Sequence, residues 1–183
     1  MSRIGLKPIE IPSGTKVKIE GGTVTVEGPK GKLTRTLSPG ISIKLEGNSL
    51  MISREGDARE ERSVHGLSRT LVANMVEGVS KGFQKTIEVS GVGFKAQKTD
   101  KGISLQVGFC HLVDFAMPAG TEAVIEGTTK VHVKGIDKEL VGLTAARIRD
   151  LRHADDYKGR GIIYSGEKLR MKPGKAGKTA LRK

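Results

Sequence analysis

Two glycine-rich segments come close to the spacing of nucleotide-binding loops. Residues 174–179 (GKAGKT) end like a P-loop, but Lys172 stands where that motif needs its first glycine, and no strand is predicted before them. Residues 90–96 (SGVGFKA) fit a dinucleotide fingerprint, yet an alternating strand follows where such a site requires a helix. We therefore predict no nucleotide cofactor, and we interpret residues 91–93 as a glycine-hinged bulge or hairpin corner. Lys95 follows this corner, where glycines let the backbone approach a phosphate closely.

The residue types that bind metals or act as nucleophiles are dispersed along the sequence. Cys110 is the only cysteine, which excludes an internal disulfide and a CxxC metal knuckle. No two histidines have the i, i+4 spacing of a metal-binding pair; they are His65, His111, His132 and His153. The adjacent carboxylates at 60–61 and at 155–156 have diverging side chains, unlike a catalytic acid–base pair. We predict neither a metal site nor an enzymatic activity.

Positive charge is concentrated at the C-terminal end of the chain. The 183 residues include 32 Lys and Arg against 20 Asp and Glu, a formal net charge of +12, and half of this excess lies in residues 153–183. The cations of this segment are Lys158, Arg160, Lys168, Arg170, Lys172, Lys175, Lys178, Arg182 and Lys183. Almost nothing apolar follows Tyr164, so we expect the segment to stay mobile until a partner holds it. A solvated tail without a partner is the alternative.

A balance this basic implies a polyanionic partner: nucleic acid, an anionic membrane or an acidic protein. No apolar run approaches the roughly 18 residues of a membrane-spanning helix, and no apolar signal core follows Met1. We therefore expect no membrane partner, and a location in the cytosol or, if a transit segment was removed, inside an organelle. With no Trp, four Phe and two Tyr, the chain cannot build a broad base-stacking platform. The expected targets are the phosphates and the shape of folded RNA.

Alternating apolar residues predict strands in the first half of the chain, followed by one helix. Strand patterns cover residues 17–26 and 41–52, with a turn at residues 28–31. The period then becomes helical, with apolar residues at Val64, Leu67, Leu71 and Met75. Asp57 and Glu60 resemble a capping box, and Gly78 is the expected end of the helix.

The same order of elements returns about 80 residues later, which indicates a duplication. Residues 126–127 (EG) lie 80 residues after residues 46–47 (EG). The second helix, with Asp137 as its expected N-cap, aligns with the first at a separation of only 76, which predicts a shorter loop before the second helix. Chance similarity between alternating strands is the alternative. We predict an α+β fold of two similar domains, residues 1–81 and 82–183, each an antiparallel sheet covered by a helix, with a basic tail at 153–183.

Six short motifs follow one another in a characteristic order. They are MSRIG at 1–5, GPKG at 28–31, HGL at 65–67, GVGF at 91–94, GF at 108–109 and DDYKGRGI at 155–162. Together they resemble the bacterial family of large-subunit ribosomal protein six over nearly the whole chain. Arg160 keeps the charge of the lysine that is usual in the family. After Gly108-Phe109 the family commonly has Ser-His-Pro and this chain has Cys-His-Leu, so no RNA contact is assigned to Cys110 or His111.

The resemblance implies a non-enzymatic, cytoplasmic constituent of the large ribosomal subunit. Its second domain and tail would bind large-subunit rRNA near the factor-binding region at the stalk base. Neighbouring large-subunit proteins and, in passing, translation factors would be further partners. The residues expected to bind rRNA are Lys95, Tyr157, Lys158, Gly159, Arg160, Gly161, Lys168, Arg170, Lys172, Lys175 and Lys178. Tyr157 and Tyr164 either stack on bases or pack against the base of the tail. A basic protein–protein adaptor with acidic partners is the competing hypothesis.

Overall fold

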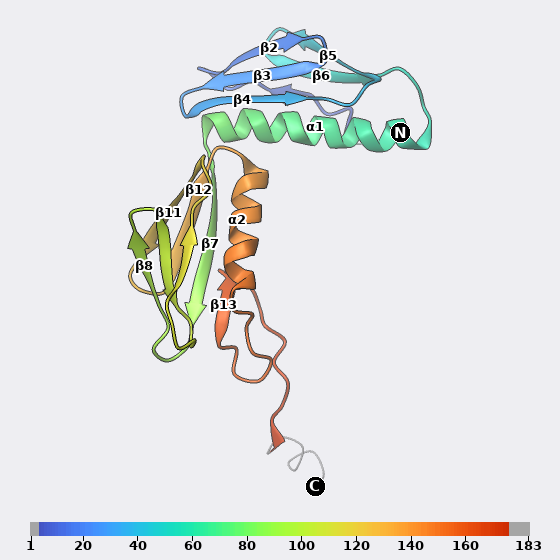
Figure 1. Ribbon diagram of the computed structural model, residues 1–183. Coiled ribbons are helices and arrows are strands. Elements are labelled where there is room, and N and C mark those ends of the chain that lie inside the picture. The colour runs from blue at the N-terminus through green and yellow to red at the C-terminus, as the bar shows by residue number, and fades with distance from the viewer. Residues whose placement is uncertain (1–3, 176–183) are drawn as a thin grey trace. The chain divides into compact units, whose positions relative to one another are not determined.

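The computed structural model describes residues 4–175, which divide into two compact units (Figure 1). The first unit contains the residues up to Phe83 together with Ile136–Lys138, and the second contains Gln84–Gly135 and the residues from Glu139 onward. Each unit combines sheets of antiparallel hairpins with one helix. The predicted α+β class with two similar halves is therefore confirmed.

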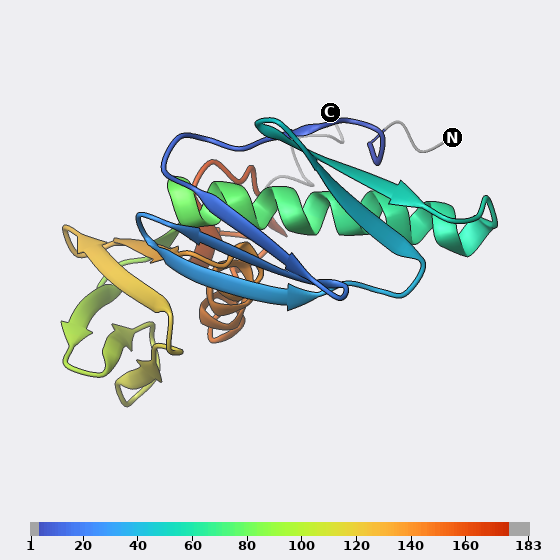
Figure 2. The ribbon, with the colours of Figure 1, turned by 90° about the horizontal axis from the view of Figure 1, so that it is seen from above.

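The first unit places two three-stranded sheets on one long helix. The sheet orders are β2-β3-β4 and β1-β6-β5. The strands are β1 Ile9–Glu10, β2 Lys16–Glu20, β3 Thr23–Gly28, β4 Gly31–Thr36, β5 Ile41–Glu46 and β6 Ser49–Arg54. Helix α1 (Arg59–Ser80) packs against β3, β4 and β6, and Figure 2 shows it running behind the strands. Alternate residues of the strands and one helix face form the core, including Val24, Val26, Leu50, Val72 and Val79.

The predicted face and ends of the first helix need correction. Leu67 is 56% exposed, and the buried face is offset by one residue, with His65, Ser68 and Val72 toward the sheets. A helix end at Gly78 is wrong, because α1 continues to Ser80 and Gly78 is buried inside it. The capping-box prediction is also displaced by one residue. Ala58 is the N-cap, and only its backbone N–H is capped, by the Glu61 carboxylate at 2.9 Å.

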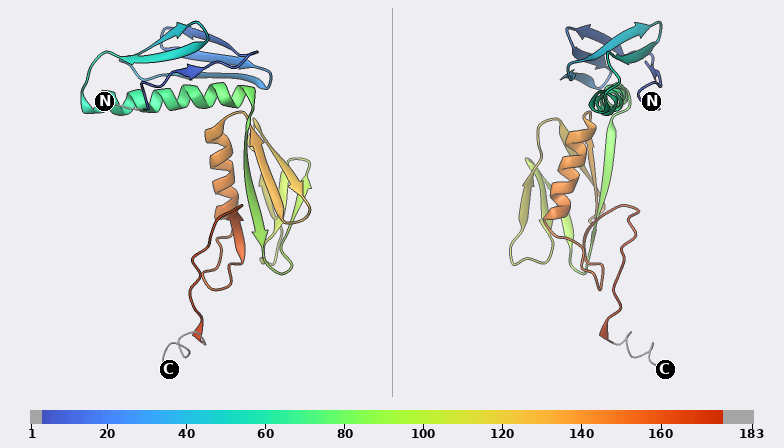
Figure 3. Two further views of the ribbon diagram at one scale, coloured as in Figure 1. Left: turned by 180° about the vertical axis from the view of Figure 1, so that it is seen from behind. Right: turned by 90° about the vertical axis from the view of Figure 1, so that its right-hand side faces the viewer.

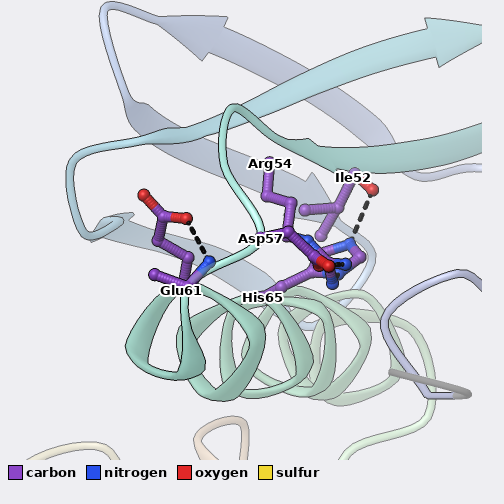
Figure 4. A network of polar contacts seen from close by, with 6 residues as sticks. Ile52, Arg54, Asp57, Glu61 and His65 are labelled. Carbon is purple, nitrogen blue, oxygen red and sulfur yellow. Dashed lines mark hydrogen bonds and ion pairs between the residues drawn. The ribbon is translucent and has the colours of Figure 1, made fainter. Parts of the chain in front are cut away.

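His65 explains why the helix turns this face inward (Figure 4). Its ring is 1% exposed, and Nε2 lies 2.8 Å from the carbonyl oxygen of Ile52 on β6. Nδ1 lies 3.4 Å from Nη1 of Arg54, which also pairs with Asp57. Because the carbonyl can only accept and the guanidinium can only donate, the hydrogen of the neutral ring sits on Nε2. Gly5 packs on the same ring, since a Cβ there would lie 2.5 Å from Nδ1.

The second unit has a four-stranded sheet, β11-β12-β7-β13, and a three-stranded sheet, β10-β9-β8. Its strands are β7 Phe83–Ser90, β8 Lys95–Thr99, β9 Gly102–Gln106, β10 Val113–Ala116, β11 Thr121–Glu126, β12 Lys130–Gly135 and β13 Gly161–Tyr164. Helix α2 (Lys138–Asp150) lies beside the four-stranded sheet (Figure 3). The buried side chains of these elements include Ile87, Val89, Val131, Val133, Val141, Ala145, Ile148 and Ile162.

The duplication is visible as one hairpin and one helix in each unit. β5 and β6 join at Gly47 with φ of +60°, and β11 and β12 join at Gly127 with φ of +67°. Glycine suits both turns, because L residues with side chains rarely adopt positive φ. Residues 55–58 separate β6 from α1, whereas only residues 136–137 separate β12 from α2. The predicted shorter loop in the second copy is confirmed, and α2 begins directly after Asp137, the predicted N-cap.

Candidate nucleic-acid interface

Three loops of the second unit meet at one end of it, which we call the loop end: residues 91–95, 107–112 and 152–160. The ring of Phe94 connects the first two, because a Cβ at Gly91 or at Gly108 would lie 2.7 Å or 3.0 Å from it. The third loop joins them where Gly161 of β13 pairs with Ser90 of β7. The prediction of a glycine-hinged bulge or hairpin corner needs correction, because residues 91–94 form a turn between β7 and β8, and these strands lie in different sheets and do not pair.

Backbone and side-chain hydrogen bonds of Asp155 close the loop that carries the DDYKGRG motif. Its backbone N–H donates to the carbonyl of Arg160 at 2.9 Å, and its own carbonyl accepts from the N–H of Gly159 at 2.9 Å. Its carboxylate accepts from the N–H of Lys158 at 3.0 Å. Gly159 has φ of +66°, a conformation that favours glycine. The closed loop leaves the side chains of Tyr157, Lys158 and Arg160 exposed.

Gly161 and Ile162 begin β13, and this corrects the expected extent of the tail. Ile162 is fully buried, pairs with Val89 of β7, and donates its N–H to the carbonyl of Arg152 at 2.9 Å. A segment with a buried strand needs no partner to become ordered. The expectation of a tail that is mobile from residue 153 is therefore wrong for residues 161–164, and the reason is a non-local strand pairing.

The carboxylates of Asp156 and Glu167, on either side of β13 in the sequence, form ion pairs within the second unit. Asp156 pairs with Lys172 at 2.6 Å, and its backbone carbonyl accepts the N–H of Lys172 at 2.8 Å. The hydrogen bond and charge of Asp156 raise the pKa of Lys172 above its usual value. Glu167 pairs with Arg149 at 2.7 Å and also accepts the backbone N–H of Tyr164 at 3.2 Å. The acidic groups thus fix the path of the chain.

Most of the predicted cations remain available to a ligand. Within residues 4–175, no ion pair involves the side chains of Lys95, Lys158, Arg160, Lys168, Arg170 or Lys175, and all six residues are exposed. Lys172 differs, because Asp156 offsets its charge. Lys178 lies outside the described residues. The geometry therefore provides a strip of uncompensated cations from the loop end along the chain that follows β13.

The two tyrosines of the segment have different environments. Tyr164 lies under two cations, with Nζ of Lys85 at 4.6 Å and the guanidinium carbon of Arg149 at 4.9 Å from its ring centroid. These cations belong to β7 and α2, so the ring of Tyr164 packs within the second unit. Tyr157 is 59% exposed and remains able to contact a ligand.

The basic turn of the first unit uses its lysines internally. The backbone N–H of Lys30 donates to the carbonyl of Val79 at 3.1 Å, and its ammonium group donates to the carbonyl of Lys81. Lys30 therefore caps the C-terminus of α1, where a cation is favoured by the helix dipole. Lys32 pairs with Glu27 at 2.9 Å. This turn is a weaker candidate for RNA than the loop end.

Sequence reasoning did not select Phe109 and Arg152. The guanidinium carbon of Arg152 lies 5.4 Å from the centroid of the Phe109 ring, which is stacked on His111. The only available signal was the position of Arg152 one residue before the basic segment, because the contact joins loops far apart in the sequence.

Other kinds of site receive no support from residues 4–175. Their His, Cys, Asp and Glu side chains form no group of three or more that could hold a metal ion. None of their helices has the length and hydropathy needed to cross a membrane.

The sequence is similar to known proteins along almost its full length. The model of the family described as ribosomal protein L6 matches residues 11–82 and again residues 90–165, one match in each half. The large ribosomal subunit protein uL6 of Halalkalibacterium halodurans is 52% identical over 178 residues, 97% of this chain and 100% of the relative. The proteins of that name from Caldicellulosiruptor bescii and Maridesulfovibrio salexigens are 52% and 51% identical, again over 97% of this chain, and over 98% and 100% of their own lengths. The chain belongs to the ribosomal protein L6 family, as the order of its motifs predicted.

Proposed function

We propose that the loop end and the chain after β13 bind large-subunit rRNA through its phosphates. The observation that carries the proposal is a set of exposed cations that form no ion pair within residues 4–175: Lys158, Arg160, Lys168, Arg170 and Lys175. The carboxylates next to them are bound within the unit. A surface of this kind attracts a polyanion and does not repel it locally.

Family membership sets the assembly in which this contact is made. The relatives are named as large ribosomal subunit proteins, and the chain is a structural, non-enzymatic protein of that subunit. Its partners are therefore rRNA and other ribosomal proteins. We extend this to a position near the factor-binding region at the stalk base, with passing contacts to translation factors, as the family resemblance implies.

The mechanism is electrostatic attachment to a folded RNA. Each lysine or arginine that neutralises a phosphate releases condensed counterions, which makes the affinity depend steeply on salt. The Asp155-centred loop holds Lys158 and Arg160 in a fixed backbone frame, so less conformational entropy is lost when they bind. Gly159 and Gly161 let this loop turn tightly where the cations are presented.

The first prediction concerns the double substitution Lys158→Gln with Arg160→Gln in the full chain. We expect the slope of log K against log salt for large-subunit rRNA to become shallower by about 2, since each lost phosphate contact removes about one unit. Filter binding at several salt concentrations measures this slope. Lys101→Gln is the matched control, because Lys101 lies in the turn at the far end of β8 from the loop end and should change the slope little.

An unchanged slope in the double variant, with unchanged circular dichroism, would remove the loop end from the interface. Full-length protein that carries no RNA, and binds acidic proteins instead, would favour the adaptor hypothesis.

A further inference from the structure

We propose that Phe109, His111 and Arg152 form a stacking site for one unpaired base of the bound RNA. This inference rests on the proposed function and adds a different kind of contact to it. Phosphate contacts position a protein on RNA, whereas stacking on a base requires a nucleotide that has left the helical stack.

The site has the geometry of an aromatic platform. The rings of Phe109 and His111 are stacked, with centroids 5.8 Å apart and planes 17° from parallel. The guanidinium carbon of Arg152 lies 5.4 Å from the centroid of Phe109. Planar groups with π-faces and guanidinium planes are the partners on which splayed RNA bases stack.

The residues next to Phe109 and Arg152 are anchored to the fold of the second unit. Val107 is fully buried directly after β9, and Gly108 turns the chain with φ of +82° against the ring of Phe94. The backbone of Arg152 is held by β13, because its carbonyl accepts the N–H of Ile162 at 2.9 Å. Both parts of the platform therefore follow directly on buried or hydrogen-bonded backbone.

Phe109 is the most exposed of the four phenylalanines. It is 40% exposed, and Phe83, Phe94 and Phe115 are less exposed. Its neighbour Leu112 is 57% exposed, and Val92 of the adjoining turn is 85% exposed. Apolar surface that is contiguous and exposed is a mark of interaction sites.

The charges around the cluster favour a nucleotide over an apolar protein surface. Lys95 follows the turn that carries Val92, and Arg160 closes the loop that begins after Arg152. Both cations are exposed and can hold the phosphates on either side of a base seated on Phe109. The one platform accommodates a single base, which agrees with the scarcity of aromatic residues in the whole sequence.

The second prediction separates stacking from charge by using full-length protein and large-subunit rRNA. Phe109→Leu keeps an apolar side chain but removes the π-face, so we expect affinity to fall about 10-fold with no change in the salt slope. Phe109→Tyr keeps the ring and should bind like the unchanged protein. The double variant at Lys158 and Arg160 shows the opposite pattern, with a changed slope.

An independent readout is ultraviolet photocrosslinking of the complex, followed by mass spectrometry of the peptides. A nucleotide crosslinked within residues 108–112 in the unchanged protein, and lost in Phe109→Leu, is the expected result. Full affinity of Phe109→Leu, or no crosslink in this segment, would overturn the stacking site while leaving the phosphate interface intact. Failure of the unchanged protein to bind rRNA would reject both proposals.

Discussion

At the scale of single residues, Gly161 is the position where the interface depends most on the absence of a side chain. A Cβ there would lie 2.5 Å from Cα of Ala154 and 2.6 Å from the carbonyl oxygen of His153, and both are backbone atoms that cannot move aside cheaply. Its φ of +152° adds strain for any other residue. Gly161→Ala should therefore destabilise the second unit by about 2 kcal/mol or more. Thermal unfolding followed by circular dichroism measures the change.

The control for this substitution lies in the same unit. Gly142 is inside α2, is exposed, and has open space where the methyl group of an alanine would lie. Gly142→Ala should stabilise the unit by about 1 kcal/mol, because alanine has the higher helix propensity. Equal effects of the two substitutions would show that close packing at Gly161 is not what selects glycine there.

At the scale of elements, β13 determines where the basic tail begins. A chain that ends after Arg152 loses the buried Ile162 and exposes the edge of β7, so we expect the second unit to unfold. A chain that ends after Glu167 keeps β13 and the Glu167–Arg149 pair, yet lacks seven cations from Lys168 to Lys183. It should keep its circular dichroism and lose several units of salt slope, at most about 6. A folded second unit in the chain that ends after Arg152 would contradict the structural role of β13.

The elements that sequence reasoning predicted correctly are those with local signals. The hairpins at Gly47 and Gly127 combine alternating strands with a glycine turn, and their separation of 80 residues revealed the duplication. Leu67 was predicted on the buried face of α1 and is exposed, because the helix buries His65 in its place. Burial of this histidine is favourable because its ring nitrogens contact the carbonyl of Ile52 and the guanidinium of Arg54. Strand β13 was missed because four residues in a basic, glycine-rich context give no period, and their partner strand lies far back in the chain.

The residues of the candidate interface could likewise be predicted only where the signal is local in the sequence. Charge and glycine content identified Lys158 and Arg160 directly from the sequence. The pairing of Lys172 with Asp156 and the packing of Tyr164 between Lys85 and Arg149 depend on how loops fold back, and spacing does not encode that. The contact between Phe109 and Arg152 was not predicted for the same reason, since it joins the loop before β10 to the loop after α2.

At the scale of the whole molecule, the chain passes from one unit to the other more than once. Residues 136–138 belong to the first unit, although residues on both sides of them belong to the second. Ile136 is partly buried against the core of the first unit, and its carbonyl occupies the space that a side chain at Gly78 would need. We propose that residues 1–81 and 82–183 nevertheless fold as separate domains, since each holds a core of its own.

The final prediction tests this division by making the two parts separately. Residues 82–183 contain the buried side chains from Ile87 to Ile162, so this fragment should unfold cooperatively and bind rRNA with the salt slope of the full chain. Residues 1–81 lack Ile136, so they should be less stable than the same residues in the full chain, and Ile136→Ala in the full chain should lower the stability of the first unit by up to about 2 kcal/mol. Calorimetry of the full chain should then resolve two transitions, of which only one responds to Ile136→Ala. A single two-state transition, with neither fragment folded, would mean that the two cores form only together.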